Sequence, residues 1–436
     1  MSSDPVARPR LARSVYPVWL ASDTATECAS SLAHFAVPLL ALMVTGSPAQ
    51  AGVIGAAGLI VRLLATLLGG VLADRHDRIR LMIMGGLAGL VTAAGFTLLA
   101  TAHALTFGVL LAADCLFAIR AGAFGVATQA ALKDVVPAAA LGRAQAANQG
   151  RDAVLALGAA PLGGVLLGVG GWLVGVVMTI LQAVAAGTAW ALRRAAGTAH
   201  TTVPTTGLAR RSAAREFGEA VRWLLRRPDL RGALLVTTLV NLGFNTVVTT
   251  VIYALQQDGT TPTAIGFVSG GLGAGMLVGA LAAPWLVSHV RTGVLAPIGL
   301  ALPVVGCAIL PFVQSVPGVA ATLALCMIGV PALSAGFLGY FMVATPSHMM
   351  GRANSVLDLF ASGAMPLSPL IAGIGLSTVG RTATLLIGLA LCAISALLAM
   401  CTASLRGLPA EAGWSAHGAA AAAESDRLSS VVTAQQ

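Results

Sequence analysis

Five polar residues near the start of the chain have the types and spacing needed to bind a substrate and protons: Asp23, Glu27, Ser30, Ser31 and His34. Steps of three, four or seven residues return to nearly the same face of an α-helix, so these side chains predict one narrow polar stripe. A polar stripe that faces lipid is costly, and we expect this one to face protein or water. A carboxyl group there can exchange a proton, and protonation can compete with the binding of a cation or substrate.

Three further ionisable residues interrupt apolar stretches later in the chain: Arg62, Asp114 and Arg120. If these stretches cross a membrane as helices, Glu27, Arg62 and Asp114 lie at a similar depth, roughly 15 to 20 Å from one face. We expect opposite charges at that depth to pair. A static ion-pair network that fixes helix packing is the alternative to a substrate and proton site, and it applies to Arg62 and His34 in particular.

The composition indicates that lipid surrounds most of the chain. Hydrophobic residues make up 57% of the 436 residues and charged residues 9%, and the mean hydropathy is +0.88. The 60 residues between Arg291 and Arg352 contain no Asp, Glu, Lys or Arg. Such a gap holds two membrane spans of about 20 residues each. Because the period-two alternation of a β-barrel is missing, the spans are predicted to be helices.

The expected architecture is an all-α membrane protein with twelve transmembrane helices in two pseudo-symmetric six-helix bundles. The predicted spans are 15–43, 49–73, 81–101, 104–128, 144–167, 171–192, 231–255, 263–287, 293–313, 318–344, 353–375 and 382–404. The corresponding domains are an N-terminal segment (1–14), an N-terminal bundle (15–192), a linker (193–230), a C-terminal bundle (231–404) and a disordered tail (405–436).

The linker contains one segment with helical periodicity. Phe217, Val221, Leu224 and Leu225 share one face of a helix, which predicts an amphipathic helix lying at the cytoplasmic membrane interface. A plain solvated linker is the alternative.

The basic residues predict the topology. With twelve crossings, 22 of the 25 Lys and Arg residues lie on the side of the two termini, only Arg381 lies on the other side, and Arg62 and Arg120 lie within the membrane. By the positive-inside rule both termini are cytoplasmic and the protein is a multi-pass protein of the cell membrane. The net charge of +9 does not indicate nucleic-acid binding, because no basic stripe interleaved with aromatic residues is present. The expected partners are the lipid bilayer, protons and a small-molecule substrate, and we expect a monomer.

No cofactor, metal site or enzymatic activity is expected. The six cysteines lie in apolar stretches without CxxC spacing and are interpreted as packing residues. The sequence contains no metal-spaced His/Glu cluster and no nucleophile constellation. Because Lys133 is the only lysine, no G-x-x-x-x-G-K-[ST] phosphate-binding loop can occur. The energy source is therefore expected to be the proton gradient rather than ATP.

The two halves of the chain resemble repeats, as expected when two bundles enclose a site near mid-membrane. Asp23 and Glu27 correspond to Asn241 and Asn245, with the same spacing of four. The two amides can hydrogen-bond a ligand without titrating, or they can join helices. Three other segment pairs also correspond: 47–52 with 261–266, 137–148 with 346–355, and 158–162 with 363–367.

Small and cyclic residues cluster in the fifth predicted span, at Gly158, Pro161, Gly163 and Gly164. Residues of these types weaken a helix locally and let neighbouring helices approach closely, so they predict bending or tight packing there.

A short basic turn between the second and third predicted spans is the strongest local signature. It contains Gly70, Asp74, Arg75, Arg78 and Arg80. This pattern resembles the turn between spans 2 and 3 of the major facilitator superfamily, and the resemblance extends over nearly the whole chain. It implies that Asp74 pairs with an arginine and a neighbouring helix terminus to latch the cytoplasmic side. Asp77 replaces the usual glycine, and Ile79 a basic residue. The alternative is a purely topogenic role, since short cytoplasmic turns are basic in any case.

Two further features resemble one branch of this superfamily. Arg120 is similar to the span 4 arginine associated with proton coupling in drug antiporters, and residues 158–164 look like the antiporter motif of span 5. Together with residues 141–144 and the Arg-Arg-Pro-Asp-Leu-Arg entry at 226–231, they resemble the drug:proton antiporters related to macrolide efflux proteins and the enterobactin exporter. This resemblance implies export.

The functional hypothesis is proton-coupled export of an amphiphilic small molecule, such as an antibiotic, siderophore or other secondary metabolite, by alternating access. Two alternatives stay open at this point. One is an uptake permease for a small solute, and the other is a non-transporting sensor or scaffold with the same fold.

Overall fold

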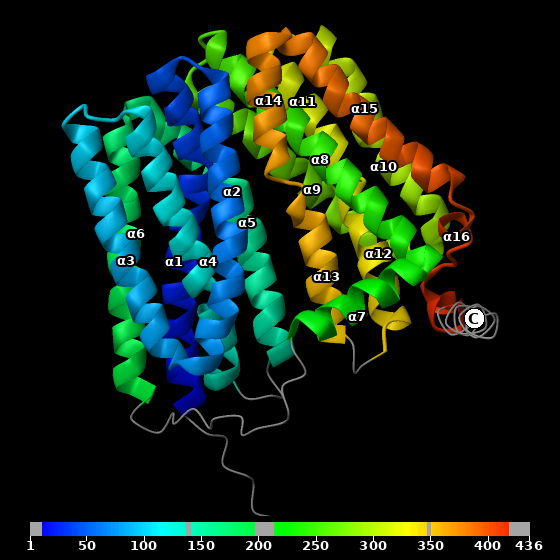
Figure 1. Cartoon of the computed structure of the whole chain (residues 1–436), viewed down its shortest axis with the longest axis horizontal. Coiled ribbons are helices and arrows are strands. Elements are labelled where there is room, and N and C mark those ends of the chain that lie inside the picture. Colours follow the sequence, from blue (N-terminus) through cyan, green and yellow to red (C-terminus); the bar gives the residue numbers. More distant parts are fainter. Residues whose placement is uncertain (1–10, 137–140, 197–212, 347–349, 418–436) are drawn as a thin grey trace, which may run out of the picture. The chain divides into compact units, whose positions relative to one another are not determined.

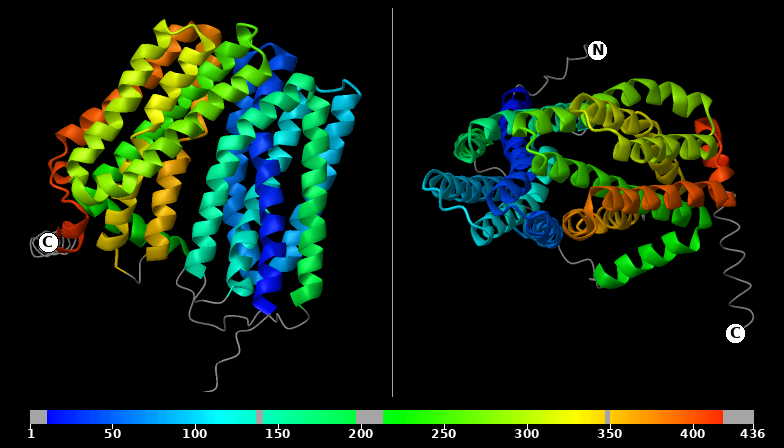
Figure 2. Two further views of the ribbon diagram at one scale, coloured as in Figure 1. Left: turned by 180° about the vertical axis from the view of Figure 1, so that it is seen from behind. Right: turned by 90° about the horizontal axis from the view of Figure 1, so that it is seen from above.

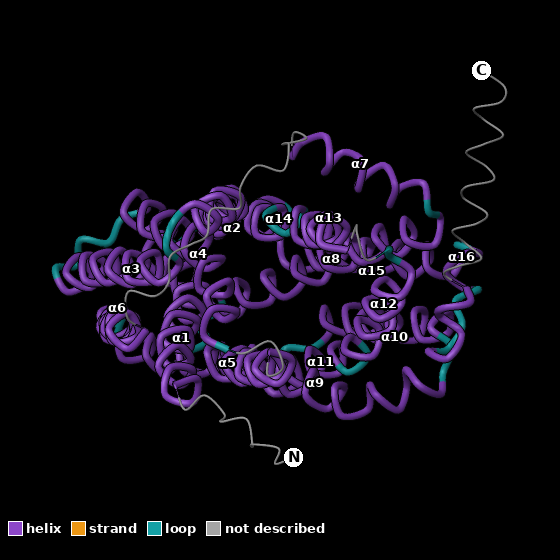
Figure 3. Tube along the Cα trace, turned by 90° about the horizontal axis from the view of Figure 1, so that it is seen from below, coloured by secondary structure: helices purple, strands orange, loops and turns teal. Residues whose placement is uncertain are grey.

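The computed structural model describes residues 11–136, 141–196, 213–346 and 350–417, which form helices joined by short connections (Figure 1). No strand occurs in these ranges, as the tube in Figure 3 shows. Twelve helical stretches within them are long and apolar enough to cross a membrane. This confirms the predicted all-α fold with twelve membrane spans.

The first half of the described chain contains α1 (Leu11–Thr45), α2 (Pro48–Arg75), α3 (Arg78–Thr101), α4 (Phe107–Val135), α5 (Leu141–Val169) and α6 (Gly171–Ala196). The second half begins with α7 (Ala213–Arg226), α8 (Pro228–Gln257), α9 (Pro262–His289), α10 (Thr292–Ile309), η3 (Leu310–Phe312) and α11 (Val316–Met327). It continues with α12 (Val330–Ala344), α13 (Met350–Gly363), α14 (Leu367–Thr378), α15 (Gly380–Cys401), α16 (Ala403–Arg406) and η4 (Glu411–Gly413).

The observed spans lie within a few residues of the predicted ones, and the fourth differs most. It was expected at 104–128, whereas α4 runs from Phe107 to Val135. The Thr106 side chain accepts a hydrogen bond from the N–H of Val109 (3.4 Å) and so caps the start of the helix. At the other end, α4 continues past the apolar stretch into exposed Lys133 and Asp134. The helix is therefore longer than the apolar stretch of sequence from which the span was predicted.

The chain forms two compact units that do not coincide with the two predicted bundles. Unit 1 comprises the described residues of 1–46, 57–205 and 259–266, and unit 2 comprises those of 47–56, 206–258 and 267–436. The first turns of α2 therefore belong to unit 2, and the first turns of α9 belong to unit 1. Residues 1–10 of the predicted N-terminal segment and residues 197–212 of the predicted linker (193–230) lie outside the described residues.

Close backbone contacts explain this exchange of helix starts. In unit 1, a Cβ added at Gly266 of α9 would lie 2.5 Å from the carbonyl oxygen of Ala160, and one added at Gly164 of α5 would overlap the carbonyl oxygen of Pro262. In unit 2, Gly52 of α2 and Gly373 of α14 meet in the same way. Small residues let helix backbones approach this closely in a membrane. The segment pairs that resemble repeats thus make equivalent contacts.

We expect Gly164→Val to destabilise unit 1 by about 1–3 kcal/mol, because the new side chain would overlap the backbone of α9. The thermal unfolding midpoint of the purified protein in detergent measures this effect. Gly158→Val is the matched control, since an added Cβ at Gly158 meets no atom within 4 Å. Equal midpoints for the two variants would contradict the proposed contact.

Helices α3 and α6 show the same principle within unit 1. A Cβ added at Gly86 of α3 would lie 2.8 Å from the Cα of Ala186, and one at Gly175 of α6 would lie 2.5 Å from the Thr97 hydroxyl. The Thr97 and Thr179 hydroxyls hydrogen-bond across the pair at 3.2 Å. Small residues and hydroxyls therefore let these helices approach closely at these points.

Two spans of unit 2 are each made of two helices. Span 10 breaks between α11 and α12, just before Pro331, and span 11 breaks between α13 and α14, at Pro366. Proline lacks an N–H and clashes with the preceding turn, which favours a break. The corresponding Pro161 lies inside an unbroken α5. The two similar proline motifs therefore differ: 363–366 interrupts its helix, and 158–164 does not.

Within the predicted linker, helix α7 packs on protein of its own unit. Ala220 is fully buried and Leu224 is 1% exposed, both in the core of unit 2. Figure 3 shows α7 alongside α8 and α13, which it contacts. Leu225, expected on the apolar face, is 39% exposed. The side of α7 that carries Ala220, Val221 and Leu224 is thus covered by the unit itself, and Phe217 lies outside the residues whose side chains are described.

Residues 405–417, predicted as the start of a disordered tail, pack against one end of unit 2 (Figure 1). Leu408 is fully buried and Trp414 is 5% exposed. The Trp414 indole N–H donates to the Thr292 hydroxyl (3.1 Å), and the Thr292 N–H donates to the carbonyl of Pro409 (3.2 Å). Two apolar anchors separated by a proline turn are enough to order a segment that lacks helical periodicity. The rest of the predicted tail lies outside the described residues.

Candidate functional site

The polar stripe of α1 lies in unit 1, where α1 packs against α4, α5 and α6 (Figure 2). Asp23 is 4% exposed. Glu27, Ser30 and Ser31 are partly buried, and His34 is exposed. The stripe therefore runs from a buried end at Asp23 to an exposed end at His34.

Asp23 forms an ion pair that the sequence analysis did not identify. The Arg151 guanidinium of α5 lies 2.6 Å from the Asp23 carboxylate and 3.4 Å from the Thr24 hydroxyl. Arg151 also bonds Asp152, at 2.7 Å. The sequence did contain a hint of this pair, because Arg151 lies two turns inside the predicted fifth span. The topology prediction nevertheless places Arg151 among the cytoplasmic charges. Asp23 is thus neutralised by a partner on another helix.

Arg120 of α4 lies at the centre of unit 1 and is 5% exposed. Its guanidinium donates to the Ser30 hydroxyl at 2.5 Å and interacts electrostatically with Glu27 and Arg62. Its Nε has no hydrogen-bond partner among the described atoms. This arginine therefore joins α4 to the stripe of α1 and has hydrogen-bonding capacity to spare.

A small residue makes room for Arg120. A Cβ added at Gly89 of α3 would lie 2.8 Å from Arg120 Cδ and 2.5 Å from the side-chain oxygen of Gln182. Gln182 of α6 is 1% exposed, and its Oε1 also has no described partner. Neither Gly89 nor Gln182 was predicted to be a site residue, because a single uncharged glycine or glutamine in an apolar span does not stand out in the sequence.

Asp114 of α4 faces α2 and not an arginine. Its carboxylate occupies the space where Gly58 has no side chain, and a Cβ at Gly58 would overlap it. No ion pair or hydrogen bond of Asp114 occurs among the described residues. Arg62, one turn after Gly58, is exposed and interacts electrostatically with His34 and Arg120.

The expected pairing of opposite charges at one depth is therefore wrong. In the described part of the chain, Glu27, Arg62 and Asp114 make no salt bridge within 4.0 Å. Depth along a helix does not determine the direction of a side chain, and Gly58 rather than Arg62 faces Asp114. Unit 1 thus contains one neutralised acid, Asp23, and two acids without a contact partner.

The matching amides in unit 2 bond to backbone. The Asn241 side chain donates to the carbonyl of Ala361 at 3.3 Å, and the Asn245 side chain donates to the carbonyl of Asn241 at 2.8 Å. Thr238 of α8 also donates to the carbonyl of Phe360, at 3.0 Å. Asn241 therefore joins α8 to the end of α13, close to the break in span 11.

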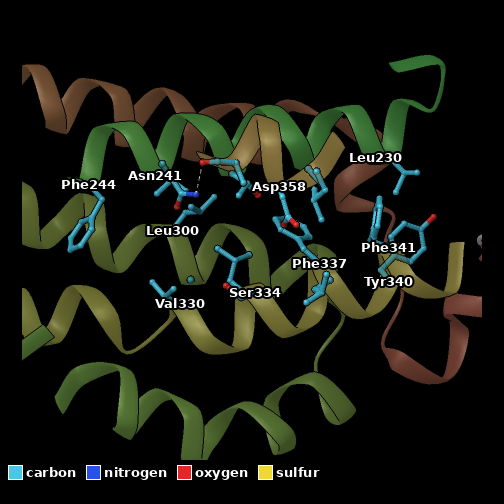
Figure 4. A pocket seen from close by; sticks show the side chains of 18 of the residues that line it. Leu230, Asn241, Phe244, Leu300, Val330, Ser334, Phe337, Tyr340, Phe341 and Asp358 are labelled. Carbon is cyan, nitrogen blue, oxygen red and sulfur yellow. Dashed lines mark hydrogen bonds between the residues drawn. The ribbon is translucent and has the colours of Figure 1, made fainter. Parts of the chain in front are cut away.

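A cavity of about 290 Å³ lies within unit 2, and Asn241 is part of its wall. Residues from α8, α10, α12 and α13 line it, together with Leu224 of α7 (Figure 4). Asn245, which is not among the lining residues, does not share this position.

The model of one protein family matches residues 24–369, and its description is Major Facilitator Superfamily. The chain belongs to the major facilitator superfamily. Members of this superfamily are membrane transporters, so the chain is a multi-pass membrane transporter and not an enzyme. No curated protein sequence is significantly similar to it.

Several solved structures share the major facilitator fold of this chain. A bacterial homologue of the iron transporter ferroportin, in an inward-facing state, has 16% identity and a TM-score of 0.67, with 89% of this chain and 98% of that chain covered. A D-xylose-proton symporter has 15% identity and a TM-score of 0.66, with 92% and 99% covered. The xylose transporter XylE from E. coli, in an inward-open conformation, has 14% identity and a TM-score of 0.63, with 90% and 96% covered.

The basic turn of this major facilitator chain has an ordered geometry despite the missing glycine. Asp77 caps the start of α3, since its carboxylate accepts from the N–H of Arg80 at 2.9 Å, and its φ of −58° suits any residue. Arg78 forms an ion pair with Asp134 of α4, at 2.9 Å. Asp74 is exposed and forms no ion pair with the described residues of its own unit.

The other motif residues of the turn lie at its surface. Arg75 and Arg80 are exposed, and an added Cβ at Gly70 would meet no atom within 4 Å. Asp77 therefore caps α3, and the Arg78–Asp134 pair joins α3 to α4.

Within the described ranges, no group of three or more His, Cys, Asp or Glu side chains is arranged to hold a metal ion.

Proposed function

We propose that this transporter couples proton movement to the export of an amphiphilic small molecule by alternating access. One observation carries the proposal. The spans of unit 1 contain two carboxyl groups, those of Glu27 and Asp114, that have no contact partner among the described residues. An unpaired carboxyl group in low-dielectric surroundings can bind and release a proton as its access to water changes.

The two acids have different roles in this proposal. Asp114 lies against Gly58 with no hydrogen-bond donor among the described residues, so it carries the transported proton. Glu27 lies in the field of Arg120, which Ser30 holds in position. When Glu27 releases its proton, the attraction between its carboxylate and Arg120 strengthens.

Asp23 has a structural role in this account. Its carboxylate is already paired with Arg151, and its burial leaves little room for a ligand. The pair joins α1 to α5 and holds the stripe in register. His34 lies at the exposed end of the stripe.

Both termini, the turn containing Gly70 to Arg80 and helix α7 are assigned to the cytoplasmic side by the distribution of basic residues. In this orientation Asp77 caps the cytoplasmic end of α3, and the Arg78–Asp134 pair joins it to the cytoplasmic end of α4. Asp74 is free within its own unit to act as the latch in one of the two access states.

The proposed cargo is an antibiotic, siderophore or other secondary metabolite. This part of the proposal rests on the likeness of Arg120 and of residues 158–164 to drug antiporters. The iron and xylose transporters described above share the fold at 14–16% identity, and their cargo is not carried over.

Everted membrane vesicles test the direction of transport. We expect vesicles containing this protein to accumulate fluorescent amphiphiles, such as ethidium or Nile red, when their interior is acidified, and to lose them when the gradient is collapsed. Vesicles without the protein are the control. If the vesicles accumulate the amphiphile only when their interior is alkaline, the protein works as an uptake system in the cell, which would contradict export.

A further inference from the structure

The cavity of unit 2 is a built pocket with one charged group. Residues of α8, α10, α12 and α13 line it, with Leu230 at one end and Phe244 toward the other (Figure 4). We infer that this cavity binds a monovalent organic cation with a compact aromatic or aliphatic body, and that Asp358 is the counter-ion. This inference rests on the proposed function, because it names the chemical class of its substrate.

The charge of the wall points to a cation. Asp358 of α13 is the one ionisable group of the lining apart from the phenol of Tyr340, and no Lys, Arg or His lines the cavity. Its side chain is exposed and accepts one hydrogen bond, from Asn354 at 3.2 Å. A carboxylate with most of its acceptor capacity unused, inside a membrane span, attracts a positive charge.

Asp229 shows the contrasting case in the same unit. Its carboxylate receives two hydrogen bonds from Arg227, at 2.7 and 3.0 Å, and one from the Tyr340 hydroxyl, at 2.5 Å. It is 3% exposed. Asp229 is thus neutralised and satisfied, whereas Asp358 keeps a carboxylate available to a ligand.

The other polar atoms of the wall favour the same ligand. The Asn241 side chain uses its N–H₂ group on the carbonyl of Ala361, which leaves its amide oxygen directed to accept. The Ser334 hydroxyl lines the cavity and is exposed. Figure 4 shows Asn241, Ser334 and Asp358 around the same space. A cation bearing hydrogen-bond donors meets acceptors at all three residues.

Aromatic rings form much of the remaining wall. Phe244, Phe337, Tyr340 and Phe341 all line the cavity. Aromatic faces attract organic cations within about 6 Å of the ring centre, and they also bury an apolar body. The volume of about 290 Å³ lies near the lower end of ligand pockets, which selects a compact ligand.

Equilibrium dialysis of the purified full-length protein in detergent tests the inference with two matched probes. Methyltriphenylphosphonium carries three phenyl rings and a positive charge, and triphenylphosphine oxide carries the same rings without a net charge. We expect the wild type to bind the cation more tightly than the neutral probe, by about 10-fold or more. One ion pair in a partly desolvated pocket contributes enough binding free energy for this ratio.

The variants separate charge from volume. Asp358→Asn should weaken binding of the cation about 10-fold and leave the neutral probe within about twofold. Asp358→Glu should keep most of the preference. Ser334→Phe, which fills the cavity without changing its charge, should reduce binding of both probes. Glu411→Gln removes an exposed acid outside the cavity and should change neither.

Three results would each overturn the inference. The Asp358→Asn variant could bind the cation as tightly as the wild type does, the wild type could bind the two probes with equal affinity, or neither probe could bind. Dialysis needs no gradient, so these outcomes are independent of proton coupling. Should the cation site fail while Glu27 and Asp114 variants still lose gradient-driven transport, the proposed function stands and its substrate belongs to another class.

Discussion

Asp114→Asn and Glu27→Gln should each reduce proton-driven transport by at least about 100-fold, the largest effect expected of any single substitution in this protein. Neither amide can carry a proton through the cycle, and Asp23, the other acid on the described part of α1, is committed to Arg151. Transport driven only by a substrate gradient should continue in Asp114→Asn, since the cavity and the helix packing stay intact.

Accumulation of a transported amphiphile in everted vesicles measures this effect, with the amount of inserted protein determined on the same membranes. Asp258→Asn is the matched control, because its carboxylate is 60% exposed at the end of α8 and bonds Arg381 only at 3.5 Å. We expect that variant to resemble the wild type. Normal coupled transport in both Asp114→Asn and Glu27→Gln would refute the roles given to these acids.

Arg227→Ala should destabilise unit 2 by roughly 3–5 kcal/mol, because it leaves the carboxylate of Asp229 buried without its partner. Arg227 is 1% exposed and Asp229 3% exposed. Tyr340 also donates to this carboxylate and lines the cavity. Loss of Arg227 should therefore loosen the contact between α8 and α12 as well as the packing of His417 beside Tyr340.

Thermal unfolding in detergent, followed by tryptophan fluorescence, provides the measurement. Arg226→Ala is the control, as the neighbouring side chain is exposed. The double variant Arg227→Ala/Asp229→Ala should recover part of the lost stability, since it removes the unpaired charge along with its partner. If Arg227→Ala lowers Tm no more than Arg226→Ala does, the buried pair does not stabilise this unit.

The spans were predictable because charged residues are so few that their spacing marks the ends of the helices. The breaks within the spans were not. Pro161 and Pro366 follow similar local sequences, yet α5 is continuous and span 11 is interrupted. Tertiary contacts decide between these outcomes, and sequence periodicity does not report them. Order in residues 405–417 was missed for the same reason, since it depends on Trp414 reaching Thr292 across the fold.

The candidate site was predictable in residue type and depth but not in contacts. Burial of ionisable residues in apolar spans identified Glu27, Asp114 and Arg120. The identity of their neighbours depends on helix rotation and on residues without charge, of which Gly58 and Gly89 are the clearest examples. The free carboxylate of Asp358 had no sequence signal, because it lies only five residues after the start of its span and resembles a residue of the helix end.

Proton movement driven by substrate is the most direct test of the central claim that Glu27 and Asp114 couple protons to transport. Proteoliposomes containing pyranine report internal pH when a transported amphiphile is added. For the wild type we predict a substrate-dependent pH change, and for the double variant Glu27→Gln/Asp114→Asn we predict none, although the variant still binds the amphiphile. A pH change in the double variant at the wild-type rate would contradict the account.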